Sequence, residues 1–201
     1  MPQRIISLVP SQTELLFYLG LGECVVGVTK FCTHPRNAKK QTTIIGGTKT
    51  LDIERIIALK PDLIIGNIEE NERTQIEQLM LTQNVVMSDI YTFDDALEMI
   101  KNIGRLTNTT PQTNAMVAEI GQRFDVLRLK IKPSKPLKIA YFIWRKPYMI
   151  AAKNTYIDAM LAQIGGVNAF SNHERYPIVT PEMIAEAQPD YIFLSSVPFP
   201  F

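Results

Sequence analysis

The chain has 201 residues, of which 46% are hydrophobic and 20% are charged, a composition typical of a globular protein and not of a disordered one. Its 21 basic and 20 acidic residues give a formal net charge of +1, and no dense lysine and arginine block is present, which argues against nucleic-acid binding. The two cysteines are too few for a disulfide framework and lack the spacing of a zinc site. The sequence contains no apolar run of about 18 residues, so no membrane-spanning helix is predicted.

Strand-like and helix-like segments alternate along the first half of the chain, a pattern typical of an α/β fold with a mainly parallel sheet. We expect buried strands at the short runs rich in aliphatic residues, at 4–8, 25–28, 43–45, 62–66 and 85–88. Helices are expected at 11–20, 53–59, 71–81 and 93–106. The expected helix caps are Ser11, which opens a capping box, Asn71 and Thr92. Together these elements predict an N-terminal lobe over residues 1–109.

A long helix is expected next, over residues 110–133. Thr110 would cap it, with Pro111 in the first helical position, where proline is favoured. Apolar residues then recur at steps of three or four, at 117, 120, 124, 127 and 131. A helix of about 21 residues is roughly 31 Å long at 1.5 Å per residue, which is long enough to connect two lobes.

The remaining residues, 134–201, predict a second α/β lobe. Strands are expected at 137–143 and 191–194, and helices at 155–164 and 181–187. The chain ends soon after the last of these strands, and we therefore expect the C-terminal lobe to be incomplete.

An internal repeat relates the two halves of the chain. Residues 54–64 and 182–192 share the pattern E-x-I-x-x-x-x-P-D-x-I. Each copy reads as a short helix stopped by proline, with aspartate opening the following strand. Such a junction is common enough to recur by chance, but the long helix between the copies favours two related lobes.

Several segments resemble the class III solute-binding proteins of ABC importers, a family of the helical-backbone metal receptor type. The resemblance is carried by RIISLVPSQTEL at 4–15, by VGVT at 26–29 with the following Phe31 and Pro35, and by 51–65. It implies two Rossmann-like α/β lobes joined by one long helix, with the ligand held between the lobes and no enzymatic activity. It further implies capture of a corrinoid or an iron chelate, such as an iron siderophore, for delivery to the membrane subunits of an ABC importer, with no intrinsic cofactor.

The resemblance also implies roles for individual residues. Phe31 matches an aromatic residue that packs on the corrin in this family, although a core residue would also explain it. Glu54 and Glu182 match the surface glutamates that contact arginines of the importer, and a solvated glutamate at a helix start is the alternative. Family members that bind vitamin B12 carry tryptophans near Thr48 and Asn67. The absence of both leaves another corrinoid, a haem-like macrocycle or an iron chelate open as the ligand.

Other candidate ligand contacts follow from residue chemistry. His34 lies in the predicted loop after Phe31, where its imidazole could ligate cobalt or haem iron, or could be an exposed loop histidine. Glu69 follows a predicted strand, where ligand-contact loops lie in open α/β sheets, although a solvated helix start is an equal alternative.

The segment 144–148 places flat aromatic rings beside cations and suits a flat ligand with carboxylates or amides. Its candidate contacts are Trp144, Arg145 and Tyr148. Asn67 and Tyr176 complete the set of side chains that we expect to contact the ligand.

Two other hypotheses remain open from the sequence. A tetrapyrrole metal chelatase also has two α/β lobes, and His34 with Glu69 or Glu70 could serve metal insertion. A cytoplasmic corrinoid carrier or sensor would keep the receptor fold without an importer. The family resemblance implies a periplasmic or cell-surface protein, whereas the first predicted strand leaves no room for a signal peptide in this chain, so a cytoplasmic location is the alternative.

Overall fold

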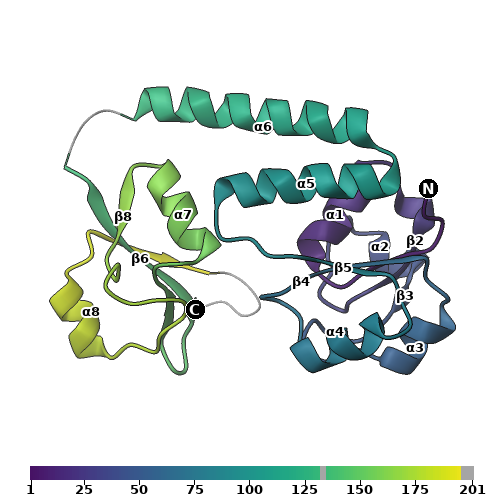
Figure 1. The fold of residues 1–201 in the computed structure, drawn as a ribbon. Coiled ribbons are helices and arrows are strands. Elements are labelled where there is room, and N and C mark those ends of the chain that lie inside the picture. The colour runs from purple at the N-terminus through teal and green to yellow at the C-terminus, as the bar shows by residue number, and fades with distance from the viewer. Residues whose placement is uncertain (132–134, 196–201) are drawn as a thin grey trace. The chain divides into compact units, whose positions relative to one another are not determined.

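The computed structural model describes residues 1–131 and 135–195, and these residues divide into two compact units (Figure 1). Unit 1 comprises Met1–Asp89 and Glu98–Met116, and unit 2 comprises Ile90–Leu97 and the described residues from Val117 onward. The lobe boundaries expected at residues 109 and 133 stay predictions. Pro133, expected to end the long helix, lies outside the described residues.

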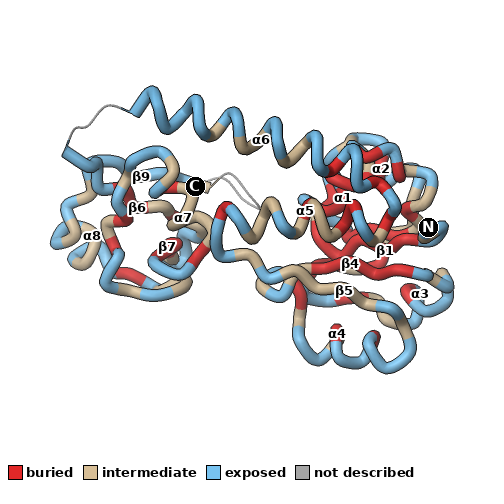
Figure 2. Tube along the Cα trace, turned by 45° about the horizontal axis from the view of Figure 1, so that its top comes forward, coloured by how far each residue is buried: buried red, intermediate tan, exposed pale blue. Residues whose placement is uncertain are grey.

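Unit 1 contains a five-stranded sheet in the order β3-β2-β1-β4-β5, in which all neighbouring strands are parallel. The strands are β1 (Ile5–Ser7), β2 (Val25–Val28), β3 (Thr43–Ile44), β4 (Leu63–Asn67) and β5 (Val85–Ser88). The predicted α/β fold with a parallel sheet is confirmed. Buried residues concentrate along β1 and β4, as Figure 2 shows, because both faces of these central strands are covered.

Helices cover both faces of this sheet, with α3 and α4 on one face and α1 and α5 on the other (Figure 1). The helices of the first part of the chain are α1 (Pro10–Tyr18), the 3₁₀-helix η1 (Gly22–Cys24), α2 (Ala38–Gln41), α3 (Ile53–Ala58), α4 (Arg73–Met80) and α5 (Phe93–Thr107). The change of face follows from right-handed crossovers, since the chain moves one way from β1 to β3 and the other way from β4 to β5.

Three of the four expected helix caps, Ser11, Asn71 and Thr110, are wrong. Pro10 is the first residue of α1 and Val9 its N-cap, so Ser11 lies inside the helix and caps nothing. Glu72, and not Asn71, caps α4 by accepting a hydrogen bond from the backbone N–H of Gln75. Asn71 does not cap the helix because its amide is buried and donates to the carbonyl oxygens of Leu8 and Thr48.

The cap of α5 is confirmed. The hydroxyl of Thr92 accepts a hydrogen bond of 3.1 Å from the N–H of Asp95, and the Asp95 carboxylate accepts one of 2.8 Å from the N–H of Thr92. This reciprocal capping box also lowers the pKa of Asp95, with the Thr92 hydroxyl as the largest cause.

Helix α6 (Thr110–Lys130) has 21 residues and begins at Thr110 itself, so Thr110 is a helical residue and not the expected cap. At its start α6 packs closely on α5. A Cβ atom added to Gly104 would lie 2.0 Å from the hydroxyl of Thr113, which is fully buried. Among the described helices, none is both long and apolar enough to cross a bilayer.

Unit 2 contains a mixed sheet built around one long strand, β6 (Leu137–Trp144). The hairpin strand β7 (Met149–Ala151) pairs with β6 antiparallel, whereas β8 (Gly166–Asn168) and β9 (Tyr191–Leu194) pair with it parallel. Helices α7 (Tyr156–Gln163) and α8 (Pro181–Ala187) complete the unit. β6, β9, α7 and α8 lie where the sequence predicts them, while β7 and β8 were not predicted.

The repeated segments form equivalent junctions from helix to strand. In unit 1 the Asp62 carboxylate accepts a hydrogen bond of 3.1 Å from the N–H of Arg4, whose guanidinium donates to the carbonyl oxygen of Leu59 at the end of α3. In unit 2 the Asp190 carboxylate accepts one of 2.7 Å from the N–H of Lys138, whose ammonium donates to the carbonyl oxygen of Ala187 at the end of α8. The sequence repeat therefore corresponds to a structural repeat and is not a chance similarity.

Candidate ligand-binding and docking sites

The strand order of unit 1 suggests a ligand site at the carboxyl ends of its parallel strands. Strands β2 and β3 lie on one side of β1, and β4 and β5 lie on the other. Loops that leave the carboxyl ends of β1 and β4 therefore diverge, which opens a crevice where ligands commonly bind in such sheets. Two of the predicted contacts lie here: Asn67 is the last residue of β4, and Glu69 lies in the loop that follows.

Three loops at this edge are held together by the side chain of Asn71, which is only 4% exposed. Its amide nitrogen donates to the carbonyl oxygens of Leu8 at 3.3 Å and Thr48 at 3.0 Å. Its amide oxygen accepts from the N–H of Asn67 at 3.0 Å. The ammonium of Lys49 adds a hydrogen bond of 2.6 Å to the carbonyl oxygen of Glu69. The edge is thus a fixed surface.

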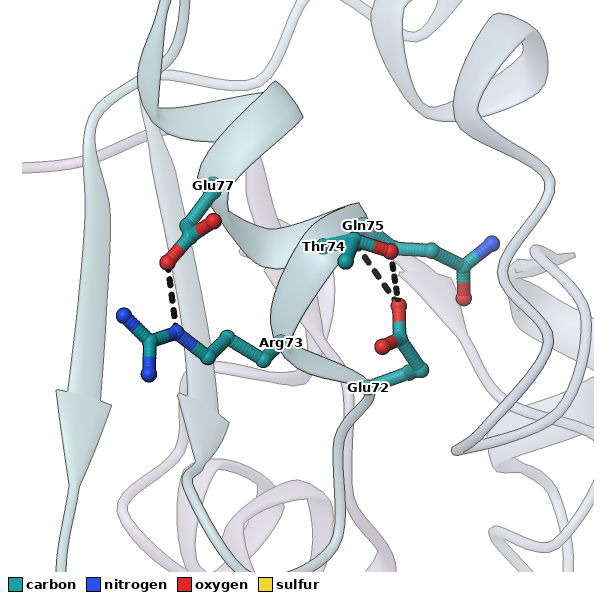
Figure 3. Close-up of polar contacts among 5 residues, drawn as sticks. All are labelled: Glu72, Arg73, Thr74, Gln75 and Glu77. Carbon is teal, nitrogen blue, oxygen red and sulfur yellow. Dashed lines mark hydrogen bonds and ion pairs between the residues drawn. The ribbon is translucent and has the colours of Figure 1, made fainter.

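The start of α4 is joined to one of these loops through Gln75. At the same helix start, the Glu72 carboxylate accepts hydrogen bonds from the Thr74 hydroxyl at 2.5 Å and from the N–H of Gln75 at 3.0 Å (Figure 3). These bonds lower the pKa of Glu72, and the Thr74 hydroxyl is the largest cause. From this first turn, the Gln75 side chain pairs with both the N–H and the carbonyl oxygen of Leu51.

Phe31 lies in the loop after β2 and is 43% exposed, so it is not a core residue. Its ring packs on the backbone of Gly47, where an added Cβ atom would approach Cε2 of Phe31 to 3.2 Å. The ammonium of Lys30 lies 5.2 Å from the ring centroid, within the range of a cation–π contact. The ring is therefore both accessible and held in place.

His34 lies in the same loop and is exposed. Its Nδ1 atom lies 3.2 Å from the hydroxyl of the neighbouring Thr33. No group of three or more histidine, cysteine or acidic side chains suited to a metal ion occurs in residues 1–131 and 135–195. Metal ligation by His34 therefore stays a prediction, in which the rest of the coordination would come from the ligand.

The side chain of Asn67 stabilises the loop that follows β4. Its side-chain oxygen accepts hydrogen bonds from the N–H groups of Glu69 at 2.9 Å and Glu70 at 3.2 Å. Its amide nitrogen donates to the hydroxyl of Ser88 at 3.2 Å. The residue thus positions Glu69, and direct ligand contact by either residue stays a prediction.

In unit 2 the predicted contacts Trp144, Arg145 and Tyr148 gather at the hairpin between β6 and β7. The indole N–H of Trp144 donates a hydrogen bond of 3.1 Å to the carbonyl oxygen of Lys146. The ring of Tyr148 packs edge-on against Phe142, with 5.8 Å between ring centroids. An open hollow of about 530 Å³ lies beside this tip, lined by residues 145–148 and 179–181.

Tyr176 lies on the segment that runs along β7, as shown by the hydrogen bond from the N–H of Ile150 to the carbonyl oxygen of Pro177. The guanidinium of Arg175 lies 5.4 Å from the ring centroid of Tyr176 and 5.1 Å from that of Tyr91. Arg175 also donates to the carbonyl oxygen of Asn154 at 2.6 Å. Tyr176 is therefore part of an aromatic and cationic cluster apart from the residues that line the hollow.

Glu54 and Glu182 occupy the second position of equivalent helices, α3 and α8, and both are exposed. Asp52 caps α3 through its carboxylate, and Thr180 caps α8 through its hydroxyl. The pKa of Glu182 is lowered, chiefly by a hydrogen bond from Thr180. Each carboxylate thus stands at the positive end of a helix dipole on the surface of its own unit.

Sequence reasoning missed two cations of unit 1, Lys30 and Lys49. Lys30 adjoins the predicted contact Phe31 in the chain, which was the available signal. Lys49 belongs to the turn at 46–51, and its bond to the loop after β4 depends on tertiary structure.

Comparison with known proteins identifies the family. The family model described as periplasmic binding protein matches residues 5–197. The chain belongs to the periplasmic binding protein family. It is 30% identical to the vitamin B12-binding protein of Vibrio cholerae over 198 residues, which cover 96% of this chain and 70% of that protein. It is also 30% identical over 199 residues to an uncharacterized ABC transporter substrate-binding lipoprotein of Bacillus subtilis, covering 95% and 63% of the two chains.

Solved structures give the same result for this periplasmic binding protein. The periplasmic vitamin B12-binding protein of Vibrio cholerae matches with a TM-score of 0.88 at 29% identity, covering 97% of this chain and 77% of that one. A periplasmic haem-binding protein from Roseiflexus sp. RS-1 matches with a TM-score of 0.84 at 25% identity, covering 96% and 76%. The relatives are substrate-binding proteins and not enzymes, so the predicted binding role is confirmed and the chelatase hypothesis is not favoured.

Proposed function

We propose that this protein captures a corrinoid or an iron chelate and delivers it to the membrane subunits of an ABC importer. The observation that carries the proposal is the exposed ring of Phe31 in the loop after β2, which packs on Gly47 and lies within cation–π range of Lys30. A flat apolar ring fixed in this way offers a stacking surface to the face of a macrocycle. Relatives named as vitamin B12-binding and haem-binding proteins support this ligand class.

Further ligand contacts are proposed for side chains of both units. In unit 1 these are His34, as an axial metal ligand, and Glu69, which Asn67 positions. In unit 2 they are Trp144, Arg145, Tyr148 and Tyr176. Aromatic rings interspersed with a few polar groups are typical of small-molecule sites.

Docking to the importer is proposed for Glu54 and Glu182. The support is their equivalence, since each is the second residue of a capped helix that ends in the same aspartate junction. Two matching carboxylates suit a partner with two related membrane subunits. A periplasmic or cell-surface location belongs to the same proposal, because the relatives are named as periplasmic proteins or lipoproteins.

Calorimetric titration with cyanocobalamin, dicyanocobinamide and haemin tests the proposal. Binding of at least one of them is expected, weakened about tenfold by Phe31→Ala, since a stacked aromatic is worth roughly 0.5–1.5 kcal/mol beyond its buried area. Tyr18→Ala, which removes a ring that is 70% exposed at the end of α1, is the matched control and should leave affinity unchanged. Failure of all three compounds to bind would refute a corrinoid or haem receptor.

A further inference from the structure

The hollow at the hairpin of unit 2 combines an apolar floor with two cations. Pro147, Tyr148, Val179 and Pro181 supply carbon surface, and Arg145 and Lys146 belong to the same lining. Thr180 completes the lining, so none of its side chains is a carboxylate or an amide. Such a surface suits a ligand with a largely apolar framework and negatively charged groups at its periphery.

The two cations lack a neutralising partner in the part of the chain that the structure describes. Neither Arg145 nor Lys146 forms an ion pair there, whereas five other arginines do. The carboxylate next to the lining in sequence, Glu182, accepts hydrogen bonds from the Thr180 hydroxyl and from its own N–H. Two positive charges beside an apolar floor therefore remain available to an anion.

The backbone that carries these cations is held in place before a ligand arrives. Trp144 holds the tip through its bond to the carbonyl oxygen of Lys146. The N–H of Val179 donates a hydrogen bond of 2.9 Å to the carbonyl oxygen of Tyr148, which joins the two sides of the hollow. A preformed site lowers the entropic cost of binding.

The donor chemistry distinguishes a carboxylate from an amide. The guanidinium of Arg145 has five N–H donors, the ammonium of Lys146 has three, and neither has an acceptor. A carboxylate has acceptors only and can pair with a guanidinium through two parallel hydrogen bonds. An amide would leave its N–H groups without an acceptor on these two side chains.

From this geometry we infer that the hollow binds a carboxylate of the ligand, so that the cargo is an anionic metal chelate with carboxylates at its periphery. The inference rests on the proposed function and narrows it, because vitamin B12-type corrinoids present neutral amides at the same margin.

Two matched pairs of probes test the inference by titration of the whole chain. The corrin pair is dicyanocobyrinic acid, which carries carboxylates, and dicyanocobinamide, which carries amides. The porphyrin pair is haemin and its dimethyl ester. In at least one pair the carboxylate member should bind about tenfold or more tightly, as charge-assisted hydrogen bonds imply, and its affinity should fall with added salt.

The variant Arg145→Gln/Lys146→Gln should abolish that preference, and Arg145→Lys should retain part of it because the charge is kept. Lys130→Gln removes a cation of α6 outside the lining and should leave the preference intact. Thermal unfolding of each variant checks that the fold is retained. Equal affinity for the neutral and charged members, or a preference that survives the double variant, would overturn the inference while leaving the proposed function standing. If no probe of either pair binds, the corrinoid or haem form of the proposed function is refuted, and the inference falls with it.

Discussion

Lys60 and Gln188 adopt the same left-handed backbone conformation, each with a φ of 47°, directly before the proline of the two repeated segments. This conformation is unfavourable for residues with a side chain by roughly 1–2 kcal/mol. It recurs because each helix must stop and turn toward a strand, with the aspartate just before that strand accepting a hydrogen bond from the backbone N–H of Arg4 or Lys138. The shared φ shows that the backbone passes from helix to strand in the same conformation in both units.

A β-branched residue at either position is expected to destabilise the protein. Gln188→Val should lower the free energy of unfolding by about 1–2 kcal/mol, because a branched Cβ is disfavoured at positive φ. Lys60→Val should act in the same direction in unit 1. Urea denaturation measures both, and Gln188→Gly is the control, since glycine adopts this conformation without steric cost. A neutral Gln188→Val would contradict the left-handed assignment.

The contact between α5 and α6 predicts opposite effects for two glycine substitutions. Gly104→Ala should cost about 1–3 kcal/mol, because the new methyl group would overlap the buried Thr113. Gly121→Ala places its methyl group in α6 with no atom within 4 Å, and it should stabilise the helix by about 0.5–1 kcal/mol. Thermal unfolding of the two variants should therefore shift in opposite directions. A similar shift for both would show that close packing at Gly104 is unimportant.

The capping box of α5 predicts a contribution to stability that depends on pH. Because hydrogen bonds from Thr92 and Tyr91 lower the pKa of Asp95, its carboxylate is favoured in the folded state. The contribution is fully present above the unfolded pKa of about 3.9 and is lost as the pH falls through the lower folded value. Melting temperatures of the wild type and of Asp95→Asn should therefore converge below about pH 4. A difference that stays constant well below that pH would contradict this role.

Charge reversal at the proposed docking residues should separate transport from binding. Glu54→Lys and Glu182→Lys are each expected to reduce ligand uptake at least about tenfold, since an unpaired charge in an interface costs 2–5 kcal/mol or more. Ligand affinity should stay within about twofold, because neither residue is a proposed ligand contact. The assay is uptake in cells that express the importer of the same organism, with Glu14→Lys on α1 as the control. Normal uptake by both variants would favour a carrier without an importer.

The sequence predicted those parts of the fold that depend on local patterns. β1 and β4 are short aliphatic runs, α6 has a sustained helical period, and the repeat marked two equivalent junctions. The three-residue strands β7 and β8 escaped prediction because strands of that length show no periodicity and arise only by pairing with β6.

The errors at the helix caps have a tertiary cause. Asn71 has the chemistry of a cap, yet its amide is drawn to backbone groups of loops far away in the chain, and Glu72 takes the capping position. Among the candidate site residues, the hairpin group at 144–148 could be recognised because its members are adjacent in sequence. The hydrogen bond from Lys49 to the loop after β4 could not, because it joins residues that only the fold brings together.

The buried amide of Asn71 also limits how this surface can change in evolution. It bonds at once to the loops that contain Leu8, Thr48 and Asn67, and each bond requires its loop to keep its present length. An insertion in any of the three would leave a buried polar group unsatisfied, at a cost of about 1–3 kcal/mol. New ligand preferences in unit 1 are therefore expected to arise by exchange of outward side chains such as Phe31 and His34, and not by growth of the loops.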